Sequence, residues 1–288
     1  MKRRSFVASA AAASIGLVAC KGTTETNTPQ PKEFSLKNNI NHSVCHWCFG
    51  DIPLEEFLQT LAELKIPAVD LMGPEQWPLL KKYGIDSAMC NGAEISLTEG
   101  FNDPQYHETL LKNYTEMIPK VAEAGYTNLI CFSGNRRGMD DSTGLQHCVS
   151  ALTQLMPLAE EHGVVLQMEL FNQRNHPDYM ADTSAWGIEL CKQLGSENFK
   201  LLFDIYHMQI QEGDIIASIQ ENHQYFGHYH TAGVPGRHEI DESQELYYPA
   251  IMKAILATGY KGYVAQEFIP VQEDKIEALK KGFLICDV

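Results

Sequence analysis

From residue 35 onward, short apolar runs alternate with longer segments in which apolar residues recur every three or four positions. The first pattern predicts buried strands and the second predicts amphipathic helices. The expected strands are INHSVCHW, AVDLM, IDSAMCN, TNLICFSG, VVLQMEL, FKLLFDIYH, YFGHYHTAG and GYVAQEF. The helices that follow them are expected from about 54, near 77, at about 104–124, 143–162 and 184–194, from about 214, at about 246–258, and from about 273.

Eight successive β/α units of this length predict an α/β fold in which parallel strands close into a (β/α)8 TIM barrel. Glycine marks two of the expected returns from helix to strand, Gly125 and Gly259, where a left-handed residue commonly ends a helix. An open doubly wound sheet is the alternative. It is weakened because neither GxGxxG nor GxxxxGK[ST], the glycine-rich phosphate-binding motifs, occurs in the sequence.

Composition and charge narrow the class of protein. Hydrophobic residues make up 44 % of the 288 residues and charged residues 20 %, which provides enough apolar material for a sizeable core. The formal net charge is −15. A general nucleic-acid binder with this charge would be repelled by the phosphate backbone. We therefore expect neither DNA nor RNA as a partner.

The first twenty residues, MKRRSFVASAAAASIGLVAC, have the pattern of an export signal. Lys2, Arg3 and Arg4 precede an apolar run that is too short to span a bilayer as a permanent helix. The Arg3-Arg4 pair resembles a twin-arginine motif, and LVAC resembles a bacterial lipobox in which Cys20 is lipidated. An ordinary secretory signal with a chance cysteine is the alternative.

These features divide the chain into an export signal at 1–20, a flexible polar tether at 21–34 and the barrel domain at 35–288. Lipidation of Cys20 would attach the protein to a membrane through an N-terminal lipid anchor. The expected location is therefore the periplasm or the cell envelope, where the protein would be an exported lipoprotein.

Seven further cysteines follow Cys20, and most lie inside apolar runs such as LICFSG and IELCKQ. We expect the larger share of them to be small buried hydrophobic residues. Cys45 and Cys48 have the CxxC spacing of redox and zinc sites, but the chain has no second CxxC to complete a zinc ribbon. A redox or zinc role for this pair is therefore disfavoured.

Four successive expected strands, the fifth to the eighth, carry a residue with metal-ligating chemistry at their carboxyl end. These residues are Glu169, Asp204, His230 and Glu267, each separated from the next by about one β/α unit. We expect them at equivalent levels on the barrel face that carries the active site. Three converging carboxylates would repel one another unless one were protonated or a cation lay between them. The alternative is that each acid forms a separate salt bridge.

Segments between residues 165 and 270 resemble a known family. MELFN, FDIYHMQIQEGD, GHYHTAGVPGRHEID, ELYYP and YVAQEFIP are similar to the xylose-isomerase-like TIM barrel superfamily of sugar isomerases and epimerases, most closely to its hydroxypyruvate isomerase branch. The resemblance implies that Glu169, Asp204, His230 and Glu267 bind a metal ion and that the two glutamates transfer protons. FSGNR, at residues 132–136, also resembles a family motif. His230 is a departure, because hydroxypyruvate isomerases often carry glutamine there, whereas ketose 3-epimerases carry histidine.

Such a site indicates chemistry through an enediolate. Oxygen ligands with one imidazole suit a divalent metal ion, Mg²⁺ or Mn²⁺ first, with Co²⁺ or Zn²⁺ as alternatives. A metal ion that polarises a carbonyl favours loss of a proton from the adjacent carbon. Return of a proton to the neighbouring carbon gives isomerisation, and return to the opposite face gives epimerisation. Glu169 and Glu267 can serve either outcome.

Three further residues are candidates for substrate binding. The resemblance implies that His207 and Arg237 contact substrate oxygens, and the fork of Arg237 could pair with a substrate carboxylate. The alternatives are a loop histidine bonded to backbone and a loop salt bridge to His238 or Glu239. His46, at the end of the first expected strand, would line the pocket together with the tryptophan that follows it.

Three functions stay open at this point. The first is an intramolecular oxidoreductase of the aldose–ketose isomerase type that converts hydroxypyruvate to tartronate semialdehyde, or acts on a similar small keto-acid or sugar. The second is a ketose 3-epimerase or another sugar isomerase of the same superfamily. The third is a sugar-binding lipoprotein without catalysis, which has no need of two proton-transferring glutamates. Barrels of this type often associate, so a homo-oligomer is a further expectation.

Overall fold

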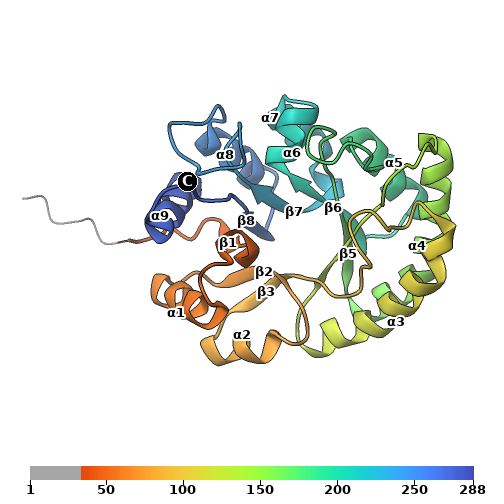
Figure 1. Ribbon diagram of the computed structural model, residues 1–288, viewed down its shortest axis with the longest axis horizontal. Coiled ribbons are helices and arrows are strands. Elements are labelled where there is room, and N and C mark those ends of the chain that lie inside the picture. Colours follow the sequence, from red (N-terminus) through yellow and green to blue (C-terminus); the bar gives the residue numbers. More distant parts are fainter. Residues whose placement is uncertain (1–33) are drawn as a thin grey trace, which may run out of the picture. The chain divides into compact units, whose positions relative to one another are not determined.

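Eight parallel strands form one sheet that curls into a nearly closed barrel in the computed structural model (Figure 1), which describes residues 34–288. Their order around the barrel is β1-β8-β7-β6-β5-β4-β3-β2. A bridge between Cys45 and Asp70 joins the first strand to the second. The strands are Asn41–Val44 (β1), Ala68–Met72 (β2), Asp86–Cys90 (β3), Asn128–Cys131 (β4), Val165–Glu169 (β5), Phe199–Asp204 (β6), Phe226–Thr231 (β7) and Tyr263–Gln266 (β8).

Helices surround the sheet, so the predicted (β/α)8 barrel is confirmed and the doubly wound alternative is wrong (Figure 1). The α-helices are Leu54–Leu64 (α1), Trp77–Tyr83 (α2), His107–Glu123 (α3), Asp141–His162 (α4), Ser184–Leu194 (α5), Ile205–Gln211 (α6), Ile215–Asn222 (α7), Tyr248–Ala257 (α8) and Lys275–Cys286 (α9). Short 3-10 turns occupy His46–Phe49 (η1), Pro104–Tyr106 (η2) and His223–Tyr225 (η3).

Burial on both faces explains the nearly continuous apolar sequence of the strands. Leu201, Leu202 and Phe203 of β6, for example, are all fully buried between the helices and the barrel interior. Gly125 and Gly259 have φ angles of 86° and 82°, the left-handed conformation predicted for these two helix ends. The apolar pattern therefore predicted the buried strands correctly, and the two glycines predicted the helix ends correctly.

The end of β6 differs from the sequence prediction. FKLLFDIYH was expected as one strand, but β6 ends at Asp204 and α6 begins at Ile205. Oδ1 of Asp204 accepts the backbone N–H of Tyr206 at 2.8 Å and that of His207 at 3.2 Å. An aspartate that caps a helix in this way ends the strand. The cap places His207 in the first turn of α6.

Residues 1–33 lie outside the described residues, so the predicted export signal, the lipidation of Cys20 and the tether stay predictions. The homo-oligomer also stays a prediction. Within residues 34–288, no helix is both long enough and apolar enough to cross a membrane. The cysteines of this part of the chain are all buried and free, including Cys45 and Cys48. The expectation of small buried cysteines is therefore confirmed.

Candidate metal centre

Four side chains with metal-ligating atoms converge at the carboxyl ends of the strands. Glu169 ends β5, Asp204 ends β6, His230 is the penultimate residue of β7, and Glu267 directly follows β8. One ligand atom of each lies within 4.8 Å of the others, and all four residues are buried. The tertiary structure thus brings together the four residues that the sequence predicts as one cluster.

Strand register explains why these side chains share one face of the sheet. Asp204 is paired with His230. Glu169 is paired with the residue two positions before Asp204, and His230 is paired with the residue two positions before Glu267. Side chains alternate along a strand, so offsets of two keep all four on the same face. Because barrel strands tilt, residues at one level along the barrel axis are offset in strand pairing, so these offsets agree with the predicted equivalent levels.

Two basic side chains contact the carboxylates of this cluster. Nδ1 of His230 lies 2.7 Å from Oε2 of Glu267 and 3.5 Å from Oε1 of Glu169. The guanidinium of Arg237 donates to Oδ2 of Asp204 at 3.1 Å and to Oε2 of Glu267 at 2.5 Å. Arg237 is therefore paired with two of the predicted ligands, and the loop salt bridge considered as its alternative is not formed.

Burial and pairing make the three carboxylates electrostatically different. Burial raises the pKa of Glu169 to about 7, although nearby His230 opposes this shift. Burial likewise raises the pKa of Asp204 to about 6, against the charge of Arg237. Burial also acts on Glu267, but there His230 and Arg237 outweigh it and hold the pKa well below its usual range. Glu267 is therefore ionised at pH 7, whereas Glu169 keeps its proton to a higher pH than an exposed glutamate does.

The chemistry of the donor set fits a divalent cation. Oε1 of Glu169 is buried and has no hydrogen-bond partner within residues 34–288. A buried polar oxygen in this state costs free energy that a bound ion would recover. Three carboxylates and one imidazole suit Mg²⁺ or Mn²⁺, with Co²⁺ and Zn²⁺ as alternatives. The four residues of the cluster could therefore hold such an ion.

His207 and Arg237 are in contact, but only Arg237 reaches the open space beside the cluster. Nη1 of Arg237 lies 2.9 Å from Nε2 of His207, and Nδ1 of His207 accepts the backbone N–H of Asn172 at 3.2 Å. Burial together with the charge of Arg237 lowers the pKa of His207 well below its usual range. The ring lies against Arg237, and its predicted contact with substrate stays a prediction.

His46 and Trp47 are adjacent in η1 and both line one cavity beside the cluster, but they have different hydrogen-bond partners. Nε2 of His46 lies 2.9 Å from the carbonyl oxygen of Ile52, so the ring is bonded to a loop. Trp47 is 47 % exposed, and its Nε1 donates to Oε1 of Glu267 at 2.9 Å. The tryptophan, and not the histidine, therefore contacts the cluster. Substrate binding by His46 stays a prediction.

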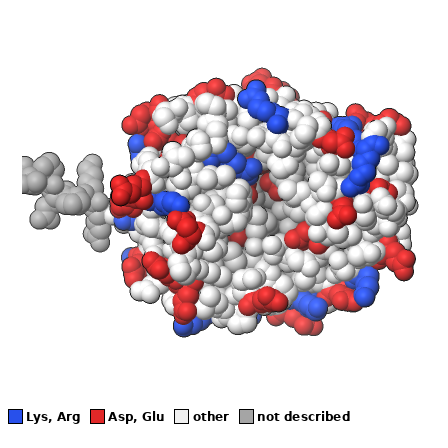
Figure 2. Space-filling model, viewed as in Figure 1, with Lys and Arg blue, Asp and Glu red and all other residues white. Residues whose placement is uncertain are grey.

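Two adjoining cavities open beside the cluster. The smaller, of about 230 Å³, is lined by Glu169, Glu267, Arg237 and several apolar and aromatic side chains. The larger, of about 730 Å³, shares Trp47 and Leu71 with it and extends along the loops that follow β2 and β3. Figure 2 shows that the visible face of the molecule is hollowed near its centre, with charged atoms inside the hollow. A small polar molecule would fit beside the glutamates.

The FSGNR segment at residues 132–136 shapes the rim and contributes no member of the cluster. Gly134 has a φ of 91°, and a side chain there would lie 2.5 Å from Oδ1 of Asn102 and 2.6 Å from the backbone nitrogen of Gly100. Nδ2 of Asn102 donates to the carbonyl oxygen of Asn135 at 2.7 Å. Only glycine fits so close an approach of two loops. Of this segment, Phe132 lines the smaller cavity.

Two residues that contact the site are absent from the sequence prediction. Oδ2 of Asp70, in β2, and Sγ of Cys45, directly after β1, lie 3.1 Å and 3.9 Å from Nε2 of His230. Both are fully buried. Asp70 carries a signal that could have found it, because it is an acid within the apolar strand AVDLM. The signal at Cys45 is its CxxC spacing with Cys48, for which a redox or zinc role is disfavoured.

Two curated relatives share part of this sequence. A 2-oxo-tetronate isomerase from Cupriavidus necator is 38 % identical over 112 residues, which cover 39 % of this chain and 43 % of the relative. A D-psicose 3-epimerase from Ruminiclostridium cellulolyticum is 29 % identical over 133 residues, which cover 45 % of this chain and 43 % of the relative. The matches therefore span less than half the length of either relative.

The fold is shared with solved structures. The structure of an AP endonuclease of family 2 from Brucella melitensis superposes with a TM-score of 0.74 at 22 % identity, covering 84 % of this chain and 96 % of that one. At this identity the likeness concerns the fold alone. The family model described as xylose isomerase-like TIM barrel matches residues 77–283. This match and the eight-stranded barrel together show that the chain belongs to the xylose isomerase-like TIM barrel family.

Proposed function

We propose that this protein is a metal-dependent isomerase of a small α-hydroxy carbonyl compound, with hydroxypyruvate as the first candidate substrate. The observation that carries the proposal is the convergence of two glutamates, an aspartate and a histidine beside a cavity of about 230 Å³. The partial similarity to a 2-oxo-tetronate isomerase supports the same class of reaction. A cavity of this size suits a compound of a few carbon atoms.

Glu169, Asp204, His230 and Glu267 would hold one divalent ion, Mg²⁺ or Mn²⁺ in view of their oxygen-rich chemistry. When bound, the ion supplies Lewis acidity, which polarises the substrate carbonyl and favours loss of a proton from the adjacent carbon. The charge of the site supports a divalent ion. As metal ligands the three carboxylates would all be ionised, and opposite one guanidinium they would then carry two net negative charges, which such an ion would balance.

The two glutamates would transfer the proton. Glu169 and Glu267 both line the smaller cavity. Glu169 ends β5 and Glu267 directly follows β8, and two other strands separate β5 from β8. They therefore approach a bound substrate from different directions, as removal and return of a proton require. Trp47 and Arg237 donate to the carboxylate of Glu267 and hold it in one orientation. A fixed orientation of the base favours the transfer.

A ketose 3-epimerase is the second candidate, and the pairing of Arg237 favours it. The guanidinium already neutralises part of Asp204 and Glu267, so it has less charge available for the carboxylate of a keto-acid. Its Nε and Nη2 N–H groups and one of those on Nη1 are directed at protein atoms, and the remaining Nη1 N–H suits a neutral hydroxyl oxygen. His230 and the partial similarity to a D-psicose 3-epimerase support the same alternative.

Solvent-proton exchange separates these functions. The full chain is incubated with Mn²⁺ in D₂O and offered hydroxypyruvate or a panel of ketoses, and the compounds are freed of metal before NMR. We expect deuterium at a carbon next to the carbonyl, with loss of exchange in the Glu267→Gln variant. The product distinguishes the two reactions, because isomerisation moves the carbonyl and epimerisation inverts one carbon.

Products are followed together with the label, because a proton transferred wholly within the site would leave no deuterium. A protein that binds Mn²⁺ but gives neither label nor product with any of these compounds would contradict catalysis. That result would favour the sugar-binding protein without turnover.

A further inference from the structure

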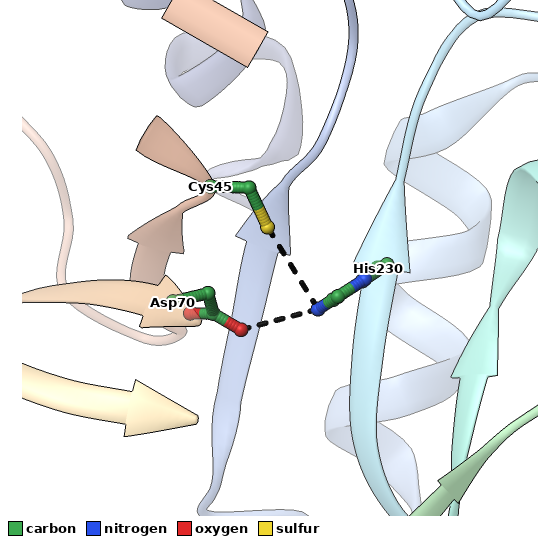
Figure 3. Close-up of side chains that lie close together, drawn as sticks. All are labelled: Cys45, Asp70 and His230. Carbon is green, nitrogen blue, oxygen red and sulfur yellow. Dashed lines mark hydrogen bonds and ion pairs between the residues drawn. The ribbon is translucent and has the colours of Figure 1, made fainter. Parts of the chain in front are cut away.

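A buried carboxylate that the proposed reaction does not use lies on the far side of His230 from the glutamates. Asp70 is fully buried, and its Oδ2 lies 3.1 Å from Nε2 of His230 (Figure 3). The other ring nitrogen, Nδ1, lies 2.7 Å from Glu267 and 3.5 Å from Glu169. The imidazole of His230 thus bridges two groups of carboxylates, one nitrogen to each.

Asp70 is itself held from two further directions. Nε2 of His228, two residues before His230 in β7, lies 2.6 Å from the same Oδ2. The backbone of Asp70 bridges to that of Cys45 and joins β2 to β1. Figure 3 shows the side chains of Cys45 and Asp70 directed toward the same nitrogen of His230. The carboxylate therefore cannot turn away from His230 without breaking other contacts.

The chemistry of imidazole gives this arrangement a consequence. A histidine ligand binds a metal ion through a nitrogen without a proton, and its other nitrogen then carries the N–H. With an ion bound, Asp70 would accept that N–H at Nε2, and the lone pair of Nδ1 would face the side of the ring where Glu169 and Glu267 lie. If the N–H lay on Nδ1 instead, a donor would face the place where a ligand is needed.

We propose that Asp70 is a positioning residue of the metal centre, which holds His230 in the tautomer and orientation that present Nδ1 to the ion. The inference rests on the metal site of the proposed function. Asp70 lines the larger cavity and not the smaller one that the two glutamates line, and its Oδ2 already contacts His228 and His230, so it acts through His230. Partners of this kind typically contribute about 10- to 100-fold to metal affinity.

A second metal ion is the competing explanation for the same group. Cys45, Asp70 and His230 offer ligand atoms that lie within 4.8 Å of one another. An ion held there would share His230 with the ion of the cluster, and the ring would have to lose both of its N–H protons. The distances to His228 and His230 account for Oδ2 of Asp70 without an ion, whereas Oδ1 has no hydrogen-bond partner within residues 34–288, so the number of ions bound per chain decides between the two explanations.

The test compares two variants of the full chain. Asp70→Asn keeps the size of the side chain and removes its charge. His228→Gln is the matched control, because it disturbs the same buried contacts while glutamine can still donate to Asp70. Metal-free protein is titrated with Mn²⁺ by calorimetry for affinity and stoichiometry. The ¹⁵N shifts of the His230 ring, recorded with diamagnetic Mg²⁺, report which nitrogen carries the proton.

For the wild type we expect one Mn²⁺ per chain and an N–H on Nε2 of His230. Asp70→Asn should bind Mn²⁺ about 10- to 100-fold more weakly and show a changed ring-nitrogen pattern, whereas His228→Gln should stay within about threefold of the wild type. Unchanged affinity in Asp70→Asn, or equal losses in both variants, would overturn the role of Asp70. So would two Mn²⁺ ions per chain.

The wild type alone decides two remaining cases. If Asp70→Asn does not fold, the wild-type ring still answers the question, because a proton on Nδ1 of His230 in the Mg²⁺-loaded protein contradicts the proposal and a proton on Nε2 supports it. A wild type that binds no Mn²⁺ would overturn the metal site and this inference together. If only the positioning role of Asp70 is disproved, the proposed function is unaffected.

Discussion

The indole N–H of Trp47 donates to Oε1 of Glu267 across 2.9 Å, although 220 positions separate the two residues in the chain. Trp47 lies shortly after β1 and Glu267 directly after β8, and these two strands pair in parallel. Pairing of the first strand with the last therefore creates the contact. The bond from Trp47 fixes Oε1 of Glu267. Arg237 and His230 contact the other oxygen, Oε2.

Replacement of Trp47 by phenylalanine removes this donor and keeps an aromatic ring. We expect kcat/KM to fall by about 10- to 100-fold, because a hydrogen bond to a charged group contributes about 1.5–3 kcal/mol. The thermal midpoint should change little, since the side chain is 47 % exposed. Trp186→Phe, which loses a bond to the carbonyl oxygen of Asp141, is the control and should keep its activity. Equal losses in both variants would show that the bond to Glu267 is not responsible.

Arg237→Met leaves the buried carboxylates of Asp204 and Glu267 without their guanidinium partner. We expect the metal-free protein to lose about 3–5 kcal/mol of unfolding free energy, because a buried charge without its partner is costly. Mn²⁺ should restore part of this loss, since it would offset the same charges. Denaturant unfolding in EDTA and in Mn²⁺ measures both effects.

The control for Arg237 is Arg137→Met, which breaks a more exposed pair with Asp103 at 3.4 Å. This pair should contribute less than about 1 kcal/mol, with no dependence on Mn²⁺. An identical loss for Arg237→Met in EDTA and in Mn²⁺ would mean that the guanidinium and the ion do not compensate the same carboxylates.

Glu169 should make the stability of the metal-free protein depend on pH. Burial raises its pKa from 4.5 to about 7, so between these values the folded chain holds a proton that the unfolded chain has released. The stabilisation is complete below pH 4.5 and is lost as the pH rises through 7. At about 1.4 kcal/mol per pKa unit, the loss from Glu169 is about 3 kcal/mol. Denaturant unfolding of EDTA-treated protein across this range measures it.

Glu169→Gln supplies the comparison for the pH series, because glutamine does not titrate. Its unfolding free energy should fall less between pH 4.5 and 7 than that of the wild type. Asp204, whose pKa burial raises to about 6, should still contribute in the variant. If the unfolding free energy of the two proteins fell equally between pH 4.5 and 7, Glu169 would not hold the additional proton.

The predicted lipidation of Cys20 can be tested by cell fractionation. In a bacterium that processes lipoproteins, the full-length protein should appear in the membrane fraction and resist washing with high salt. Cys20→Ser should abolish that association, because serine has no thiol to carry the lipid. Replacement of Arg3 and Arg4 by lysines should block export if the twin-arginine route is used. A Cys20→Ser protein that stays in the membrane fraction would contradict the lipid anchor.

By itself, the sequence determined the barrel and the residues of the cluster. Parallel strands are buried on both faces, so each apolar run stands out, and a charged residue at its end is conspicuous. Four strands end in this way, at Glu169, Asp204, His230 and Glu267. The spacing of these residues, about one β/α unit, predicts that they meet. These are properties of local pattern, which a linear chain displays directly.

Only the tertiary structure decided which other groups surround these four residues. Asp70 and His230 lie 160 positions apart, and Trp47 and Glu267 lie 220 apart. Their contacts depend on barrel closure and strand register, which no local pattern specifies. The orientation of Arg237 toward the carboxylates and the burial of His207 are decided in the same way. Local periodicity determines that a residue is buried, but the pairing of distant strands determines which buried polar groups meet.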